Sequence, residues 1–226
     1  MVLLLESCAP APEKVPKNSY GLQVIKHAAT YRKLIEKDSI RRMVLLANFL
    51  HPLHYKLYYA STDNFTHQQL YHHPALYLRL EAATKLARVQ DSLLKTGLCL
   101  FLFDAYRPYS VTQKMWQMVP DERYAANPAR GSGHNRGVAI DLTLADAATG
   151  LPLEMPTPFD NFSDSAHHNF MVLAPAILKN RALLKGIMAY FGFEALPTEW
   201  WHYSIANPKK YQLLDLNFIQ MKKNTQ

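Results

Sequence analysis

The stretch Ser132-Gly-His-Asn-Arg-Gly-Val-Ala-Ile-Asp141 decides the fold of this chain. It contains two residues of the types that bind metals, and they can meet only if this short segment folds back on itself. His134 and Asp141 are seven positions apart, and extended chain of that length would span roughly 20 Å. Both side chains can reach one ion only if the chain folds back, and the glycines beside His134 allow such a turn. The sequence therefore predicts a tight turn, followed by a strand over Val138–Leu144 that carries Asp141.

A second segment, Glu199-Trp-Trp-His202, supplies another imidazole and a spare carboxylate. Two imidazoles and one carboxylate suit a catalytic zinc that keeps its fourth position open. We therefore expect His134, Asp141 and His202 to bind one Zn²⁺ per chain, with Glu199 as the general base. Residues three apart face opposite sides of a regular strand, so a bulge or a strand end must bring Glu199 beside His202.

Each of these side chains also has an ordinary structural explanation when it is taken alone. A lone His or Asp is more often a surface or capping residue than a ligand, and Glu199 could simply be exposed. The pairing of the two segments with one another and with Arg107 favours the metal site. The His-Glu-x-x-His motif of the common helical zinc proteases is absent from the sequence.

Arg107 directly follows the apolar run Leu98–Phe103, in the sequence Asp104-Ala-Tyr-Arg-Pro108. Binding and catalytic groups often lie on the loop after a strand. A guanidinium there could stabilise an oxyanion that forms on a scissile carbonyl. An ion pair with Asp104 that serves only the structure is the alternative at this position.

The pattern of apolar residues predicts an α+β domain with a small antiparallel sheet flanked by helices. We expect a flexible leader over 1–18 and a single catalytic domain over 19–226. Residues 20–38 are typical of a helix or an extended arm. The expected helices are 74–96, 108–118 and 180–191, and the expected strands besides Val138–Leu144 are Tyr55–Ala60, Leu98–Phe103 and Trp200–Ile205.

The composition narrows the class of protein further. The chain has 226 residues and a formal net charge of +7, but its Lys and Arg residues are scattered along the sequence in short pairs. No basic stripe with interleaved aromatic residues is present, so we do not expect nucleic-acid binding. No apolar run approaches the roughly 20 residues of a transmembrane helix. The sequence does not specify an oligomeric state.

The N-terminal sequence carries a faint signal about the cellular compartment of the protein. Leu5-Glu-Ser-Cys8, followed by Ala-Pro-Ala-Pro, faintly resembles the end of a lipoprotein signal, although Glu6 is a poor residue there. Cytoplasm and periplasm therefore both stay open. The second cysteine, Cys99, lies in an apolar run and is expected to be a buried thiol and not a disulfide partner of Cys8.

Five segments, in order, resemble the signatures of D-alanyl-D-alanine dipeptidases of the vancomycin-resistance type, and the resemblance covers residues 55–205. The resemblance implies a bacterial enzyme with the α+β fold of zinc D,D-peptidases, shared with D,D-carboxypeptidases and the hedgehog signalling domain. The segments are Ser61-Thr-Asp-Asn-Phe-Thr66, Phe103-Asp-Ala-Tyr-Arg-Pro108, Ser132–Leu144, Leu153-Glu-Met-Pro-Thr-Pro-Phe-Asp160 and Glu199-Trp-Trp-His202.

The resemblance also implies roles by position. Arg107 would stabilise the tetrahedral intermediate, and Asp160 would bind the free ammonium of a small D,D-dipeptide substrate. Ser132 and Tyr124 are further candidates for substrate contact. The chain departs from the family in having Pro156 where glycine is usual and in a shorter connection between Arg107 and the metal-binding turn.

The expected function is hydrolysis of D-alanyl-D-alanine to two D-alanines in bacterial cell-wall precursor metabolism. Two alternatives stay open. A D,D-carboxypeptidase would cut peptidoglycan stem peptides, and a zinc-containing binder of wall fragments would not catalyse at all. N-acetylation of the substrate separates the dipeptidase from the D,D-carboxypeptidase, because a blocked amine abolishes cleavage by the dipeptidase only.

Overall fold

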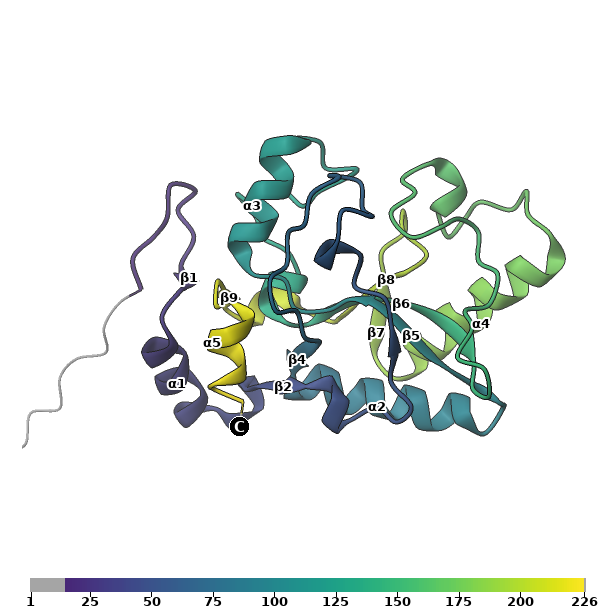
Figure 1. Cartoon of the computed structure of the whole chain (residues 1–226), viewed down its shortest axis with the longest axis horizontal. Coiled ribbons are helices and arrows are strands. Elements are labelled where there is room, and N and C mark those ends of the chain that lie inside the picture. The colour runs from purple at the N-terminus through teal and green to yellow at the C-terminus, as the bar shows by residue number, and fades with distance from the viewer. Residues whose placement is uncertain (1–14, 226) are drawn as a thin grey trace, which may run out of the picture.

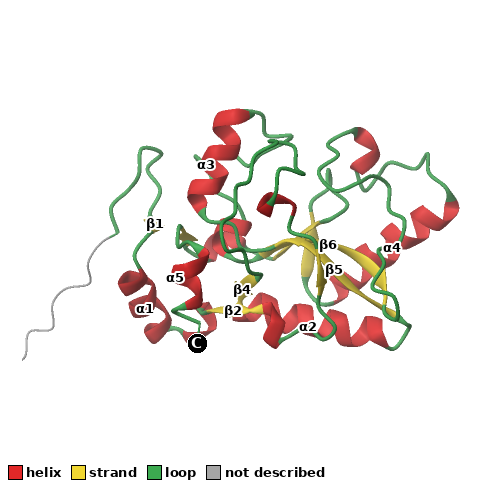
Figure 2. Ribbon diagram, in the orientation of Figure 1, coloured by secondary structure: helices red, strands yellow, loops and turns green. Residues whose placement is uncertain are grey.

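The structure, a computed structural model, describes residues 15–225 and is built around a five-stranded sheet with the strand order β3-β5-β6-β8-β7. Figure 2 shows this sheet between helices, as the α+β prediction requires. All neighbouring strands are antiparallel except β3 and β5, which run parallel. The strands are β3 (His54–Tyr55), β5 (Leu98–Asp104), β6 (Ala139–Asp146), β7 (Phe193–Ala195) and β8 (His202–Ile205).

Three helices surround this sheet. Helix α2 (Leu80–Leu94) packs against β5, and helix α4 (Pro175–Tyr190) packs against β7 and β6. Helix α3 (Tyr109–Met118) begins just after the end of β5 (Figure 1). Leu86, Val89 and Leu93 of α2 are almost completely buried, so this helix turns a continuous apolar stripe toward the core.

The strand register lines up three functional positions in one row. Asp141 on β6 is opposite Asp104 on β5 and opposite His202 on β8. The pairing of β5 with β6 shifts between Leu102 and Asp104, so a bulge lies immediately before the row. Bulges redirect side chains and often occur beside active sites. The strand register therefore brings these three residues together, although they are far apart in sequence.

Two sequence-based predictions about the first half of the chain are wrong in part. The predicted strand Tyr55–Ala60 is limited to β3, and a 3₁₀ turn follows at Tyr58–Ala60. The ring of Tyr59 packs there against other aromatic rings, and this tertiary packing overrides the strand propensity of the segment. The predicted helix 74–96 begins only at Leu80, because strand β4 (Tyr77–Arg79) pairs with β2 (Met43–Leu45).

Other boundaries agree more closely. The strand Leu98–Phe103 and the helix 108–118 are confirmed to within one residue. Helix α4 begins five residues before the predicted 180, with Pro175 in its first turn, a position that proline favours. Strand β8 begins at His202 and not at Trp200, because both tryptophans lie in the turn that leads into the strand.

The two ends of the described chain meet. Strand β1 (Val24–Ile25) pairs in parallel with β9 (Leu213–Leu214), and α1 (Ala28–Lys37) lies beside α5 (Phe218–Lys222) in Figure 1. None of the helices in residues 15–225 is long and apolar enough to cross a bilayer. Most of the expected leader, including Cys8, lies outside the described residues. The 3₁₀ helices are Ser39–Arg41, Leu46–Asn48, Tyr58–Ala60, His134–Arg136, Asp164–Ala166 and Pro208–Lys210.

Candidate metal centre

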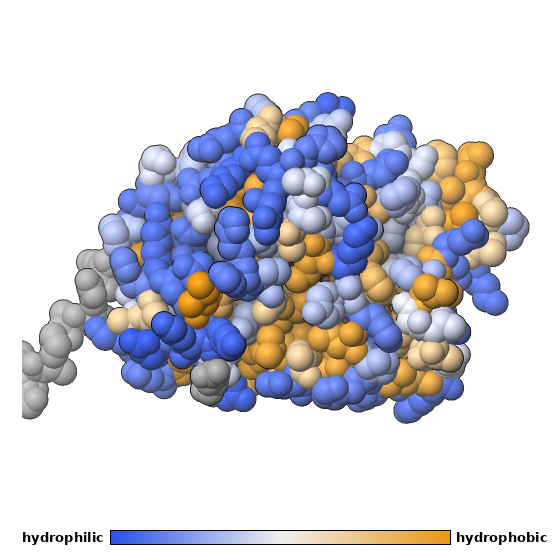
Figure 3. Space-filling model, viewed as in Figure 1, coloured by the Kyte–Doolittle hydropathy of each residue, from blue (hydrophilic) through white to orange (hydrophobic). Residues whose placement is uncertain are grey.

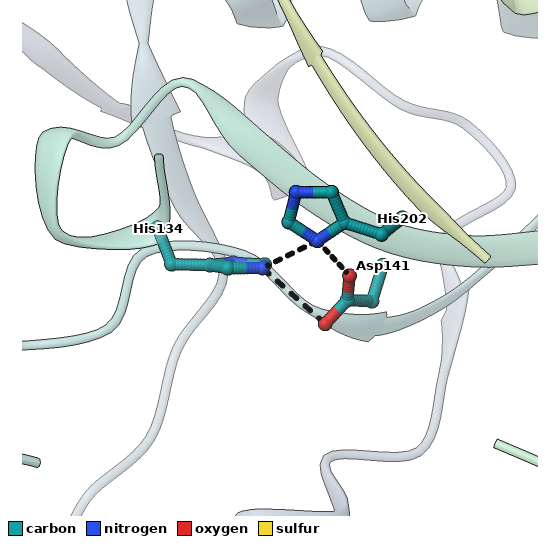
Figure 4. Close-up of side chains that lie close together, drawn as sticks. All are labelled: His134, Asp141 and His202. Atoms are coloured by element: carbon teal, nitrogen blue, oxygen red, sulfur yellow. Dashed lines mark hydrogen bonds and ion pairs between the residues drawn. The ribbon is translucent and has the colours of Figure 1, made fainter. Parts of the chain in front are cut away.

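Three side chains from separate elements meet where strand β8 begins, beside the central strand β6. His134 Nε2 lies 3.2 Å from His202 Nδ1, and Asp141 lies 2.9 Å from His202 Nδ1 through Oδ1 and 3.4 Å from His134 Nε2 through Oδ2. Figure 4 shows the three groups converging on one point. One ligand atom from each residue lies within 4.8 Å of the others. The arrangement could hold a metal ion with two nitrogens and one oxygen.

The predicted glycine turn brings His134 to Asp141. His134 begins a short 3₁₀ helix that ends at Arg136 and is capped by Gly137, whose φ of 68° is left-handed. Gly133 also approaches the next strand closely, since a Cβ on it would lie 2.7 Å from that of Ala139. The backbone N–H of Val138 donates to the carbonyl of Gly133 and closes the turn. Both glycines are therefore needed, one for its backbone angle and one for its small size.

A backbone carbonyl on the far side of the ring fixes the orientation of His134. Its Nδ1 lies 2.7 Å from the carbonyl oxygen of Ala105, which can only accept a hydrogen bond. Nδ1 therefore carries a proton and donates it to this carbonyl, and Nε2 faces Asp141 and His202. This is the usual support for a histidine ligand, whose second nitrogen is bound by a backbone carbonyl or a carboxylate.

The electrostatics of the centre keep Asp141 charged. Burial alone would raise the pKa of Asp141, but the adjacent His134 and His202 hold it well below its usual range. Burial opposes protonation of His202, yet the hydrogen bond and charge of Asp141 raise the pKa of this imidazole overall. Asp141 therefore stays ionised, and its negative charge favours a cation, either a proton or a metal ion, at the ring nitrogens.

Glu199 lies beside this centre in the turn before β8. Its Oε2 is 3.9 Å from His202 Nδ1, so the end of the strand brings the two residues together as the sequence required. Burial raises the pKa of Glu199, and the charge of Asp141 adds to this effect. No hydrogen bond reaches its carboxylate from residues 15–225. The group is placed to accept a proton from a molecule in the site.

The guanidinium of Arg107 forms an ion pair with Asp104 and also lies close to Asp141. Its Nε and Nη2 donate to the same oxygen of Asp104 at 3.0 and 2.7 Å, while Nη2 lies 3.9 Å from Asp141 Oδ2. Burial opposes the charge of Arg107, but Asp104 raises the pKa of the guanidinium well above its usual value. The backbone N–H of Arg107 also donates to the carbonyl of His134. The ion pair that the sequence suggested therefore fixes a guanidinium beside the candidate metal ligands.

The expected substrate contacts lie on the same cavity. Asp160 has a left-handed φ of 59° and accepts hydrogen bonds from the hydroxyl of Tyr59 at 2.9 and 3.2 Å. Burial, and next the charge of Asp141, raise the pKa of Asp160 well above its usual range. Ser132 accepts from the backbone N–H of His134, and the ring of Tyr124 packs on Phe162 at the rim.

The cavity has a volume of about 240 Å³ and is lined by all eight predicted site residues. Sequence reasoning missed Tyr59, Phe162 and Leu196, and it considered Asp104 only as a structural partner. An acidic residue at the end of a wholly apolar strand was a usable signal for Asp104. No comparable signal marks Tyr59, which is 101 residues from its partner Asp160. The remaining lining residues are Glu122, Ala125, Ala126, Gly133 and Trp201.

Comparisons with known proteins agree on one family. The model of the Peptidase M15 family, described as D-ala-D-ala dipeptidase, matches residues 39–223. The D-alanyl-D-alanine dipeptidase of Escherichia coli K12 is 37% identical over 172 residues, which cover 76% of this chain and 89% of that protein. The enzyme of the same name from Enterococcus faecalis is 31% identical, covering 72% and 90%, and that from Enterococcus faecium is 32% identical, covering 70% and 88%.

Among solved structures, that of the LdcB LD-carboxypeptidase matches with a TM-score of 0.37 and 16% identity, over 66% of this chain and 70% of that one. This likeness is too low for a conclusion about function to rest on it.

Proposed function

This chain belongs to the D-ala-D-ala dipeptidase family, and from that premise we propose that it is a zinc peptidase that hydrolyses D-alanyl-D-alanine to two D-alanines in bacterial cell-wall precursor metabolism. The observation that carries the proposal is the meeting of a His-Asp-His triad with Glu199 and Arg107 in one small cavity. The enzyme class, a hydrolase of the M15 peptidases, follows from the family.

The donor set supports zinc as the metal. His134, Asp141 and His202 offer two imidazole nitrogens and a carboxylate oxygen, a typical three-residue set for catalytic zinc with one open position. Asp141 is charged, and the hydrogen bond from His134 Nδ1 to Ala105 turns Nε2 toward the centre, an arrangement that suits a metal ligand. When bound, zinc polarises a carbonyl and lowers the pKa of water toward about 7.

Glu199 would act as the general base and acid. Its carboxylate would take a proton from the water that attacks the peptide carbonyl, and it would return that proton to the leaving amine. Its raised pKa supports the first half of this role, because a carboxylate with a higher pKa is a stronger base.

Arg107 would stabilise the negative charge that develops on the carbonyl oxygen. Its ion pair with Asp104 holds the guanidinium in place before substrate binds, and the stack of Arg107 over the ring of Tyr59, 4.9 Å from the ring centroid, limits it further. A preorganised cation costs little reorganisation during the reaction.

Asp160 would bind the free ammonium of the dipeptide, with the hydroxyl of Tyr59 orienting its carboxylate. Burial leaves Asp160 poorly solvated, so an ammonium that pairs with it replaces missing water. Ser132 and Tyr124 would contact the rest of the substrate. The cavity volume of about 240 Å³ lies below the usual 300–1,000 Å³ range of small-molecule sites and supports a substrate as short as a dipeptide.

The deciding experiment is amine release from D-Ala-D-Ala by the zinc-loaded protein. N-acetyl-D-Ala-D-Ala, L-Ala-L-Ala and the Glu199→Ala variant serve as controls. Cleavage of the free D,D-dipeptide alone, lost in the variant, is the expected result. Cleavage of the acetylated substrate would indicate a D,D-carboxypeptidase. Bound zinc without turnover of any D,D-peptide would indicate a binder of wall fragments.

A further inference from the structure

The net positive charge of the protein is concentrated at one end of the fold. We define the terminal lobe as residues 15–42 and 206–225, which contain eleven Lys and Arg residues and three Asp and Glu residues. Residues 43–205, which carry the metal centre, contain thirteen of each sign. The body of the protein is therefore neutral, and the terminal lobe has a net charge of +8.

Tertiary structure assembles the terminal lobe from the two ends of the described chain. Strand β1 pairs with β9, Arg32 of α1 donates to Asn224 and Arg41 donates to the carbonyl of Lys210. Figure 1 shows α1, β1, β9 and α5 together at one end, apart from the strands β5, β6 and β8 that carry the site. Basic pairs that are scattered in the sequence thus become neighbours in space.

The acidic residues of the terminal lobe neutralise little of this charge. Asp38 pairs with Arg41, and Asp215 is used internally, since it accepts from the backbone N–H of Ser110 at 2.8 Å. Lys210 pairs with Glu81 of the body. Within the described part of the chain, the other nine Lys and Arg side chains of the terminal lobe form no ion pair, and all nine are exposed.

Exposed apolar side chains lie among these cations. Ile40 is 45% and Ile219 is 48% exposed. Ile219 is followed at helical spacing by Lys222 and Lys223, which places an aliphatic side chain and two cations on one face of α5. Figure 3 shows this end of the molecule covered by hydrophilic residues with small apolar spots between them.

From the charge asymmetry and these side chains, we propose that the terminal lobe is a docking surface for an anionic phospholipid bilayer. Basic side chains are attracted to acidic headgroups, and aliphatic side chains beside them enter the interface. Nucleic acid fits less well, because single strands are bound by aromatic stacking and Tyr20 is the only aromatic residue in the described terminal lobe that is largely exposed. The proposal is independent of the dipeptidase assignment.

The test is sedimentation of the full chain with vesicles of phosphatidylcholine alone or with phosphatidylglycerol added. We expect binding only to the anionic vesicles. We also expect release when the salt concentration rises from about 0.1 M to about 1 M, which shortens the Debye length from about 10 Å to about 3 Å. Equal binding to neutral vesicles, or binding to neither, would overturn the proposal. Binding to single-stranded DNA but not to vesicles would assign the surface to nucleic acid instead.

A matched pair of variants locates the surface. The triple variant Lys33→Glu, Lys37→Glu and Lys222→Glu should lose at least about tenfold in vesicle affinity. The control triple, Lys95→Glu, Lys114→Glu and Lys179→Glu, changes the net charge equally on the exposed body of the protein and should bind nearly as the wild type does. Circular dichroism spectra and urea unfolding of both triples should match those of the wild type, which verifies that they fold. Equal loss in both would show that overall charge, and not the terminal lobe, governs binding.

Discussion

The hydroxyl of Tyr71 donates a 2.8 Å hydrogen bond to Oδ1 of Asp104, and both groups are buried. The other oxygen of this carboxylate accepts both hydrogen bonds from Arg107. Tyr71 therefore anchors the partner of the guanidinium without touching the cavity itself. This chain of contacts makes the position of Arg107 depend on a residue outside the site.

Replacing Tyr71 with Phe should lower kcat by roughly tenfold, because Asp104 and with it the guanidinium lose a fixed position. The fold should lose about 1.5–3 kcal/mol, the contribution of a hydrogen bond to a charged group. KM and zinc content should change little, since the metal ligands and Asp160 are not contacted. Steady-state kinetics and metal analysis of Tyr71→Phe check this. A rise in KM alone, with kcat unchanged, would contradict a role in positioning Arg107.

Glu199→Gln should retain zinc and lose about 10²- to 10⁴-fold in turnover, the usual contribution of a general base. The amide has the same shape but cannot take the proton. Metal content and kcat are measured on the same preparation, so that a loss of zinc cannot be mistaken for a loss of the base. A variant with wild-type turnover would remove Glu199 from this role.

The two partners of the buried ion pair should respond differently to removal. Arg107→Ala should lower kcat by about 10²- to 10³-fold, as loss of an oxyanion-stabilising group does. Asp104→Ala should destabilise the fold by about 3–5 kcal/mol, because it leaves a buried guanidinium uncompensated. Kinetics and urea unfolding of both variants test the contrast. Wild-type kinetics in Arg107→Ala would place this residue outside the reaction.

Asp160→Asn should raise KM for D-Ala-D-Ala by at least about tenfold, since the charge that pairs with the ammonium is lost while the shape is kept. N-acetyl-D-Ala-D-Ala should stay uncleaved by both the wild type and the variant, because its blocked amine cannot pair with the carboxylate of Asp160. Steady-state kinetics with the free dipeptide check the prediction. A loss of kcat with an unchanged KM would show that Asp160 acts on the chemical step instead.

His168 should make the fold sensitive to acid. Burial, with the nearby charges of Lys185 and Arg181, lowers its pKa from 6.5 to about 4, and both ring nitrogens are buried without a hydrogen-bond partner in the described chain. The unfolded chain therefore binds a proton that the folded chain does not, so stability falls as the pH drops from about 6.5 to about 4. Urea unfolding at pH 7 and pH 5 should show a smaller decrease for His168→Phe than for the wild type. Equal decreases would contradict this assignment.

Local sequence predicted much of the site, because its parts lie in short segments with distinctive residue types. The turn at Gly133 and Gly137 follows from the need to fold His134 back to Asp141. The spacing of Glu199 and His202 required either a bulge or a strand end, and the structure has a strand end there. The wrong boundaries arose where a segment pairs with distant chain. Strand β4 takes residues from the predicted α2 because β2, more than thirty positions earlier, lies beside it.

The sequence by itself determined the α+β class and singled out the candidate donor set, the candidate base and the arginine, since these depend on residue type, spacing and the period of apolar residues. Only the tertiary structure brought Tyr59 to Asp160 and Tyr71 to Asp104, and only it gathered scattered basic pairs into the terminal lobe. The physical reason is the same in each case. Local patterns reflect backbone geometry and burial over a few residues, whereas contacts between distant segments arise from the packing of the whole core and the register of its sheets.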